Sequence, residues 1–272
     1  MAGHLVYDYL KIIPKYIVEG TFHSNSMGYN LDVSVEANVL AFFENHTYDW
    51  VINCIGSLVK ASEDNPLMAT RINSVFPRLL EKVFMDTNTR LIHISTDCVF
   101  SGKDGKYTEL SQRDGYDIYA KTKAIGEIIN DKDLTLRTSI IGPNSKANGN
   151  GLFDWFIKQT GKVNGYNNHL WGGVTTLELA KVIEYCIQNP IHGLVNVTNG
   201  ISISKLELLR EFNKIWKNNR VQINETDDLT SIDKSLISMR GDFNYTVPGY
   251  HTMLLELKEY MDLNKNKYNA YY

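Results

Sequence analysis

The sequence predicts an α/β protein in which helices cover a parallel sheet. Short apolar runs at 49–56, 90–95 and 134–141 have the length and branched side chains of buried strands. Between them, residues 65–88 and 119–130 carry apolar side chains at helical spacing. Strands that alternate with helices are typical of a parallel sheet, because parallel neighbours need a crossover connection.

Size and composition exclude several classes of protein. The 272 residues suffice for one large or two unequal domains, and 43% hydrophobic with 22% charged residues is ordinary globular usage. A formal charge of −3, with no long basic block, gives no electrostatic case for nucleic acid. No apolar run approaches a membrane span and the N-terminus lacks a signal-peptide pattern, so we expect neither membrane insertion nor export, and a cytoplasmic location.

The three cysteines predict reduced thiols. Cys54, Cys98 and Cys186 lie far apart and form no CxxC pair. This spacing favours neither disulfides nor structural zinc.

The first half of the chain predicts the main sheet. An amphipathic helix is expected at 4–13 and a short strand at 16–19, followed by the strand DWVINCIG that ends at Gly56. The helix at 65–88 leads to the strand RLIHIS, and the helix at 119–130 leads to LTLRTSII. A turn-rich segment at 144–150 predicts the exit from this sheet.

The second half of the chain predicts helices that begin at capping boxes. Thr175 with Glu178, and Ser204 with Glu207, are capping boxes that predict two helix starts. A small strand is expected at 194–197 and a last helix at 250–261. The polar residues 264–272 are expected to be loosely held.

Tyr119 and Lys123 form a Tyr-x-x-x-Lys pair on a predicted helix, where this spacing places both side chains on one face. A free tyrosine has a pKa near 10, and a nearby ammonium favours the phenolate. Such a pair predicts proton transfer near neutral pH. The alternative is a chance spacing in a chain that has 16 tyrosines.

Ser95, Thr96 and Asp97 end the strand RLIHIS, at the sheet edge where open α/β proteins bind ligands. Their hydroxyl groups can donate to a carbonyl oxygen. The alternative for this triplet is a helix cap or an Asx turn.

These residues resemble the extended short-chain dehydrogenase/reductase superfamily and, within it, the dTDP-4-dehydrorhamnose reductase group. The resemblance covers nearly the whole chain. It lies in the strings VINCIG, HISTDCVFSG, YTE, YAKTKAIGE, LRTSIIGP, WGGVTTLELAK and DKSLISMRGDFNYTVPGY.

The resemblance implies a Rossmann-type doubly wound parallel sheet with a smaller C-terminal α/β substrate domain. Residues 1–143 would form the dinucleotide-binding domain and 144–262 mainly the substrate-binding region, with some segments that return to the main sheet, before a tail at 263–272. The implied reaction is NAD(P)H-dependent reduction of the C4 ketone of a nucleotide-linked 4-keto-6-deoxy sugar, dTDP or UDP linked, for deoxysugar and surface polysaccharide synthesis.

The resemblance also implies residue roles. Tyr119 would be the general acid, Lys123 would lower the pKa of that phenol and bind the nicotinamide ribose, and Thr96 would hydrogen-bond the substrate oxygen. Asp97 and Trp171 would complete the substrate contacts. The chemistry implies no metal.

Cofactor contacts follow from the same resemblance: Gly3, Asp32, Val33, Cys54, Ile55, Gly56, Asn73, Tyr119 and Lys123. Asp32 and Val33 correspond to the pair that meets the adenine. Residues 20–23 carry neither the acid typical of an NAD site nor the arginine typical of an NADP site. We favour NADPH over NADH because His23 and Ser24 can meet a phosphate. His93 is expected to be a packed core histidine.

The N-terminus departs from the family pattern. Met1 to His4 resembles the end of the glycine-rich turn, so Gly3 would be its third glycine, and the first strand and two glycines are not in the sequence. Either the natural chain carries roughly a dozen further residues before Met1, as we favour, or a shortened chain is compromised or repurposed.

Two other functions stay open on the sequence. One is a nucleotide-sugar epimerase of the same superfamily. The other is a non-catalytic dinucleotide-binding regulatory subunit, like the β-subunit of methionine adenosyltransferase, which shares this fold. Assembly as a homodimer is also left open.

Overall fold

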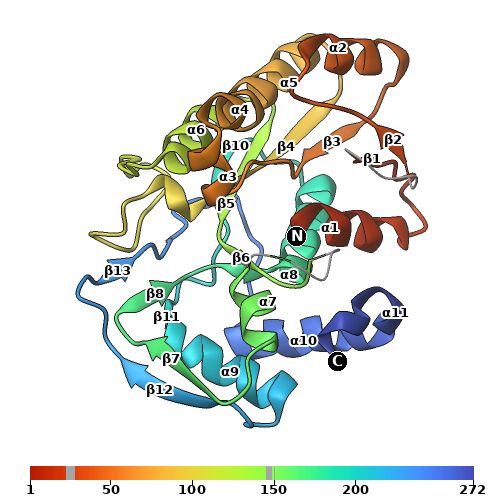
Figure 1. Ribbon diagram of the computed structural model, residues 1–272. Coiled ribbons are helices and arrows are strands. Elements are labelled where there is room, and N and C mark those ends of the chain that lie inside the picture. Colours follow the sequence, from red (N-terminus) through yellow and green to blue (C-terminus); the bar gives the residue numbers. More distant parts are fainter. Residues whose placement is uncertain (23–27, 145–148, 150) are drawn as a thin grey trace.

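The computed structural model describes residues 1–22, 28–144, 149 and 151–272 (Figure 1). His23 and Ser24, to which we assigned a phosphate contact, lie outside the described residues, as does most of the predicted turn-rich segment 144–150.

The centre of the molecule is a four-stranded parallel sheet with the order β10-β5-β4-β3. In this sheet β4 pairs with β3 from Trp50↔Arg90 and with β5 from Ile92↔Leu134. The sheet confirms the predicted α/β class, and its strands are β3 (Trp50–Asn53), β4 (Arg90–Thr96), β5 (Leu134–Thr138) and β10 (Gly193–Asn196).

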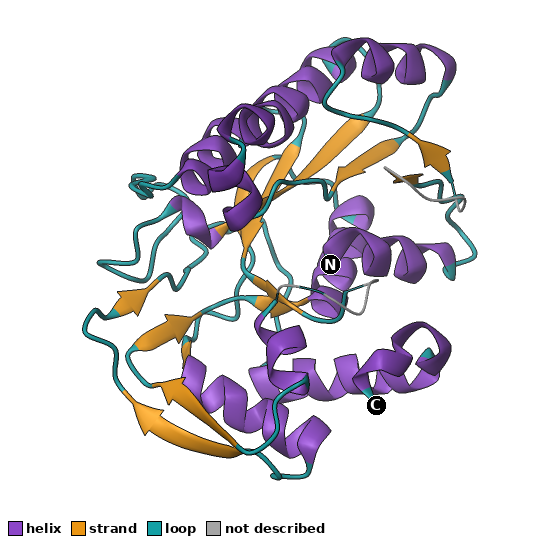
Figure 2. Ribbon diagram, in the orientation of Figure 1, coloured by secondary structure: helices purple, strands orange, loops and turns teal. Residues whose placement is uncertain are grey.

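Helices cover both faces of this sheet (Figure 2). Alternate residues of β4 explain why: Leu91 packs with the helices of one face, and Ile92 packs in the larger core on the other. The first face carries α2 (Glu36–Asn45), α4 (Pro66–Thr70), the π-helical turn η1 (Arg71–Val75), α5 (Phe76–Phe84) and α6 (Ile118–Gly126). The second carries α1 (Ala2–Lys11) and α8 (Thr176–Gln188).

A smaller lobe lies below the carboxyl edge of the sheet (Figure 1). In it β8 lies between β11 and β13, β12 pairs with β7, and β6 pairs with β9. The strands are β6 (Ile140–Ile141), β7 (Lys162–Tyr166), β8 (His169–Trp171), β9 (Val174–Thr175), β11 (Ile203–Ser204), β12 (Gln222–Thr226) and β13 (Ile232–Asp233). The helices are α7 (Leu152–Ile157), α9 (Lys205–Lys217), α10 (Tyr250–Leu263) and α11 (Lys265–Tyr268).

Both capping boxes work as predicted. Thr175 Oγ1 accepts the N–H of Glu178 at 3.1 Å, and Ser204 Oγ accepts the N–H of Glu207 at 3.1 Å. These caps start α8 and α9. Because α8 and β10 belong to the main layers, the smaller lobe is discontinuous in sequence.

Some boundaries differ from the sequence prediction. Residues 16–19 form no strand, and the extended pairing begins instead at β1 (Thr21–Phe22), which pairs with β2 (Tyr29–Asn30). The segment 134–141 is split at Ser139 into β5 and β6, because β6 leaves the main sheet to pair with β9. Residues 59–64, after β3, form the helix α3 (Val59–Asp64).

The C-terminal tail is packed, which corrects the expectation that it is loosely held. Tyr268 and Tyr271, in α11 and the short 3-10 turn η3 (Asn269–Tyr271), are 1% and 9% exposed. The hydroxyl of Tyr271 donates to the buried carboxylate of Asp154 in α7. Aromatic rings therefore fix a segment whose polar composition suggested the reverse.

The pairing of β1, β2 and β3 does not test the expected first strand. Among the described residues β3 pairs only with β4, and β1 and β2 pair only with each other, so the expected first strand stays a prediction.

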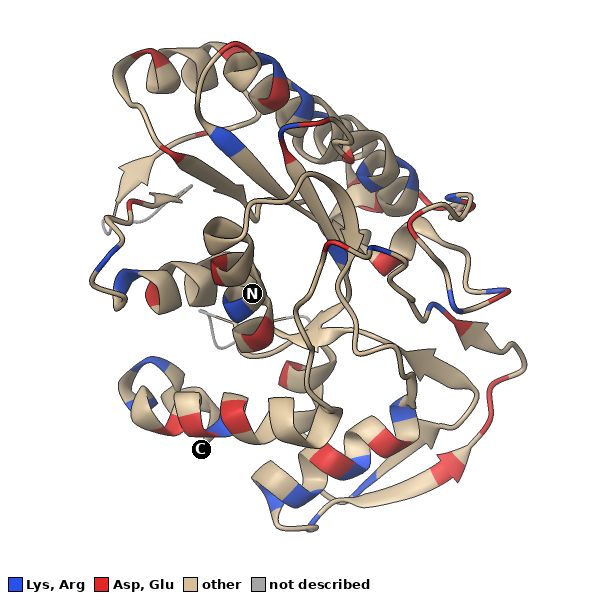
Figure 3. Ribbon diagram, turned by 180° about the vertical axis from the view of Figure 1, so that it is seen from behind, with Lys and Arg blue, Asp and Glu red and all other residues tan. Residues whose placement is uncertain are grey.

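Basic and acidic residues are interspersed along the outer helices (Figure 3). In the described part of the chain, no helix is both long and apolar enough to cross a membrane.

Candidate active site

The site is built at the carboxyl end of β4, where the strand gives way to the 3-10 turn η2 (Asp97–Val99). Thr96 Oγ1 accepts the N–H of Cys98 at 3.1 Å and lies 3.2 Å from Oδ1 of Asp97, to which it donates. The residue is therefore both the cap of this turn and a hydroxyl at the sheet edge. A capping role for Thr96 is therefore compatible with the predicted hydrogen bond from its hydroxyl to a substrate.

Tyr119 stands in the first turn of α6, and Asp117 caps that helix by accepting the N–H of Ala120 at 2.7 Å. Burial raises the pKa of Tyr119, and nearby Cys98 raises it further, whereas a hydrogen bond with Thr96 acts in the opposite direction. Tyr119 and Thr96 therefore lie close enough for the hydroxyl to influence the phenol, and their joint contact with a substrate stays a prediction. At neutral pH the phenol holds its proton, which suits a proton donor.

The Lys123 side chain points toward β4, and its predicted effect on the pKa of Tyr119 stays a prediction. Its Nζ donates to the carbonyl oxygen of Ile94 at 2.7 Å and lies 3.5 Å from Nε2 of His93. The side chain is 4% exposed, and burial lowers its own pKa to about 8. The i, i+4 spacing put both residues on one face, but the ammonium turns under the helix toward β4.

His93 is fully buried, as predicted, yet it contacts the predicted catalytic set. Its Nδ1 lies 3.1 Å from Nδ2 of Asn53, on the neighbouring strand β3, and its Nε2 faces Lys123. Burial holds the pKa of His93 well below its usual range, and nearby Lys123 adds to the effect. In the sequence, the contact of His93 with Lys123 is indicated only by the place of His93 on a strand that packs against the helix of Lys123.

Asn73 positions the loop after β3. Its Oδ1 accepts the N–H of Ser57 at 2.7 Å, and its Nδ2 donates to the Ser57 carbonyl and to Thr122 Oγ1, both at 3.1 Å. The side chain is fully buried, so it is not a solvated helix residue. Gly126 permits this packing, since a β-carbon there would lie 1.9 Å from the Asn73 carbonyl oxygen. Contact of Asn73 with a cofactor stays a prediction.

Below the site lies a fully buried ion pair. Arg137 donates from Nε and Nη2 to the two oxygens of Glu127, each at 2.8 Å. Ser95 donates to the same carboxylate at 2.7 Å, and Arg113 at 3.0 Å. Sequence analysis did not single out this pair, which joins β4, β5 and the end of α6.

Asp97 and Trp171 connect the two lobes. Burial raises the pKa of Asp97, while Lys234 and hydrogen bonds from Thr96, Cys98 and Ser139 oppose the shift. Trp171 Nε1 donates to Ser139 Oγ at 2.9 Å, and the indole is 8% exposed. Trp171 therefore packs in the core and reaches the site through Ser139. Its contact with a substrate stays a prediction.

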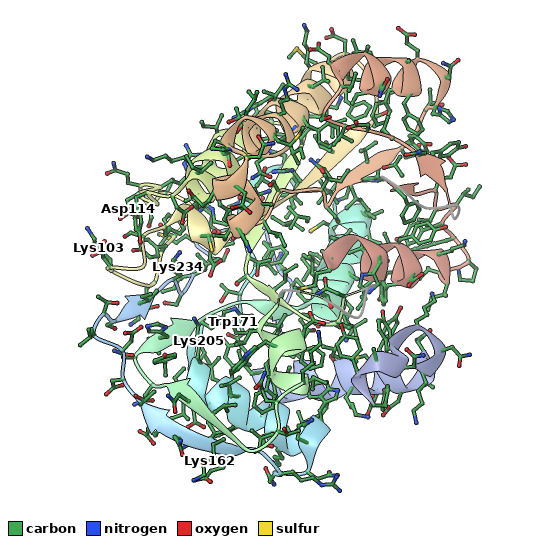
Figure 4. All side chains as sticks on the ribbon, in the orientation of Figure 1. Lys103, Asp114, Lys162, Trp171, Lys205 and Lys234 are labelled. Carbon is green, nitrogen blue, oxygen red and sulfur yellow. The ribbon has the colours of Figure 1, made fainter. Side chains whose placement is uncertain are left out.

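Two lysines of the smaller lobe lie beside the site (Figure 4). Lys234 follows β13, and a β-carbon at Gly102 would lie 3.0 Å from its Cγ, so its stem packs on the loop after η2. Lys205 begins α9, where Asp97 and Lys234 both influence its charge and burial lowers its pKa. Among the described residues neither ammonium has a carboxylate within 4.0 Å. Lys234 lies in the string DKSLISMRGDFNYTVPGY, which carries the family resemblance, but neither lysine was predicted as a site residue.

Two of the predicted cofactor residues, Gly3 and Cys54, are neighbours. Gly3 lies against the loop after β3, because a β-carbon there would be 3.4 Å from Cβ of Cys54. The first turn of α1 has no side-chain cap, which suits an anion. Asp32 accepts both the N–H and the hydroxyl of Ser34, at 2.9 and 2.7 Å, after β2. Contact of these residues with a dinucleotide stays a prediction.

A parallel sheet with Thr96, Tyr119 and Lys123 at its carboxyl edge defines a Rossmann-type protein of the extended short-chain dehydrogenase/reductase superfamily. Within that superfamily, the family model described as the RmlD substrate binding domain matches residues 16–231. The chain belongs to this family, as the sequence motifs predicted.

Curated relatives match parts of the chain. A probable low-salt glycan biosynthesis reductase, Agl14, of Haloferax volcanii is 31% identical over 137 residues, 46% of either chain. A dTDP-4-dehydrorhamnose reductase of Mycolicibacterium smegmatis is 37% identical over 99 residues, 35% of this chain and 30% of that one. The chain thus spans less than half the length of these two relatives.

Solved structures share the fold. A dTDP-4-dehydrorhamnose reductase from Clostridium acetobutylicum has a TM-score of 0.76 at 22% identity, covering 97% of this chain and 96% of that one. The Bacillus anthracis enzyme, solved with NADP, has 0.71 at 20% identity, covering 83% and 87%. UDP-glucose 4-epimerase from Thermotoga maritima has 0.78 at 14% identity, covering 97% and 96%. The fold alone therefore does not separate reductases from epimerases.

Proposed function

We propose that this protein reduces the C4 ketone of a nucleotide-linked 4-keto-6-deoxy sugar with a nicotinamide dinucleotide as the hydride source. The proposal rests on the placement of Tyr119, in the first turn of α6, close enough to Thr96, at the end of β4, for the Thr96 hydroxyl to influence the phenol. Names of relatives support the reaction class: four of them are dTDP-4-dehydrorhamnose reductases and one is a dTDP-4-keto-6-deoxy-D-glucose reductase.

In this proposal the chain's residues handle the proton and the developing charge. A bound reduced nicotinamide would supply the hydride. Tyr119, protonated at neutral pH, gives its proton to the substrate oxygen, and Thr96 donates a hydrogen bond to the same oxygen. Gly3, Asp32, Val33 and the loop at 54–56 would hold the dinucleotide. We favour NADPH over NADH, as the sequence analysis did.

Lys205 and Lys234 suit the diphosphate of the substrate. Lys205 and Lys234 repel each other although Asp97 acts on both, so a bound anion would reduce the repulsion. The N-terminus of the 13-residue helix α9 adds positive potential at Lys205. Their place beside Asp97 would leave the sugar facing Thr96 and Tyr119.

The test is oxidation of NADPH or NADH with dTDP-linked and UDP-linked 4-keto sugars. Tyr119→Phe is expected to lower kcat roughly 100-fold to 10,000-fold without loss of stability, because it removes the proton donor. Tyr116→Phe is the matched control, since Tyr116 lies three residues earlier and is 77% exposed.

Three outcomes would contradict the proposal. Tyr119→Phe could retain full activity. The protein could interconvert sugar epimers with no net cofactor consumption, which would indicate an epimerase. It could also bind dinucleotide and oxidise nothing with any of these sugars, which would favour the regulatory subunit.

A further inference from the structure

The hydrogen bonds around His93 determine where its proton lies. Asn53 Oδ1 accepts the N–H of Ile55 at 3.0 Å, which identifies that atom as the carbonyl oxygen. The amide nitrogen therefore faces Nδ1 of His93, at 3.1 Å. An amide nitrogen can only donate, so Nδ1 must accept, and a neutral imidazole with an unprotonated Nδ1 carries its proton on Nε2.

That proton points at Lys123. Nε2 of His93 and Nζ of Lys123 are 3.5 Å apart, and Nζ already donates to the Ile94 carbonyl oxygen at 2.7 Å. An ammonium has no lone pair and cannot accept the Nε2–H, whereas a neutral amine can accept it and still donate to Ile94. The arrangement is thus complete only when Lys123 has lost a proton.

We propose that Asn53 and His93 form a positioning pair that fixes Lys123 under α6 and favours its neutral amine. Neither residue touches the reacting atoms, so both act through Lys123. The proposal rests on the proposed function only where it counts Lys123 as part of an active site.

The surrounding charges do not replace this effect. Glu127, from the end of α6, and Cys54, after β3, both favour the ammonium of Lys123. The Glu127 carboxylate is already shared by Arg137 and Arg113. Arg78, from α5, acts on His93 and disfavours its imidazolium. The imidazolium would also place two donors face to face at Asn53, so His93 stays neutral.

The experiment is NMR of the full chain with ring-15N histidine and ε-13C lysine, which needs no turnover. Spectra of His93→Phe and Lys123→Met assign the two signals. In the wild type, His93 is expected to carry its proton on Nε2 throughout the neutral range, and Lys123 to titrate near pH 8. Because neither measurement needs turnover, the His93 tautomer and the Lys123 midpoint can be determined even if the proposed function is wrong.

Two uncharged substitutions test the coupling. Asn53→Leu removes the amide that donates to Nδ1 of His93, and His93→Phe removes the Nε2–H that faces Lys123. Each substitution is expected to raise the titration midpoint of Lys123 by about one pH unit, a tenfold change in proton affinity. Thr135→Val is the control, because Thr135 pairs with His93 in the sheet but its hydroxyl bonds Ile128. It should lower stability and leave the Lys123 midpoint unchanged.

A wild-type His93 protonated on Nδ1 would overturn the proposal. So would an unchanged Lys123 midpoint in folded Asn53→Leu and His93→Phe proteins. If either variant fails to fold, the wild-type tautomer still decides.

Discussion

Arg137 and Lys123 are two buried basic residues whose surroundings differ. Arg137 meets a bidentate carboxylate, a serine hydroxyl shares that carboxylate, and the Phe100 ring lies 4.9 Å from the guanidinium. Among the described residues, Lys123 of α6 donates to a carbonyl oxygen and lies beside a histidine nitrogen, and no carboxylate lies within 4.0 Å of its ammonium, although Glu127 acts on it from farther away. A compensated charge holds structure together, whereas an uncompensated one keeps a proton that is easily lost.

The largest expected effect comes from breaking the compensated site. Glu127→Gln leaves Arg137 buried without its counterion, and we expect the free energy of unfolding to fall by about 3 to 5 kcal/mol. Urea denaturation measures the change. Glu207→Gln is the control: its pair with Arg210 is exposed and should cost less than about 1 kcal/mol. Equal costs would show that burial does not separate the two pairs.

The uncompensated site predicts a pH dependence of stability. The folded pKa of Lys123 is about 8, below the ordinary 10.5, so between these values the unfolded chain binds more protons. The contribution of Lys123 to unfolding free energy therefore rises with pH across this window, by about 3 kcal/mol. The difference between wild type and Lys123→Met, measured in urea at a series of pH values, should show this rise. A difference independent of pH would mean that Lys123 is not a strained cation.

Asp154 is an intermediate case, a buried carboxylate held by neutral donors. Tyr271 and Asn144 both donate to it. Tyr271→Phe is expected to cost about 2 kcal/mol, because a hydrogen bond to a buried charge is lost. Tyr272→Phe serves as the control, since Tyr272 is 56% exposed. Thermal unfolding of the two variants distinguishes them, and equal midpoints would show that the tail does not anchor α7.

The smallest effect is expected at the half-buried lysines. Lys234→Met should weaken binding of dTDP or UDP roughly fivefold, about 1 kcal/mol, with kcat for the sugar substrate little changed. The loss should shrink at high salt. Lys103→Met, a change at an exposed lysine nearby (Figure 4), is the control. Equal affinity in both variants would place the diphosphate elsewhere.

The sequence located much of the candidate site because its signals are local. Thr96 ends a strand and Tyr119 starts a helix, and the topology of a parallel sheet brings such ends to one edge. It did not show that the Lys123 ammonium donates to the Ile94 carbonyl oxygen, since spacing specifies a helix face and not a rotamer. It also assigned no role to Lys205 and Lys234, since their place beside Asp97 depends on strand pairing across β8.

Apolar periodicity, cap chemistry and family motifs by themselves determined the α/β class, the starts of α8 and α9, and the set Thr96, Tyr119 and Lys123. Only the tertiary structure decided which buried charge is paired, where His93 places its proton and why the tyrosine-rich tail is ordered. Hydrogen-bond partners and burial depend on residues distant in the chain, and these contacts set protonation and stability.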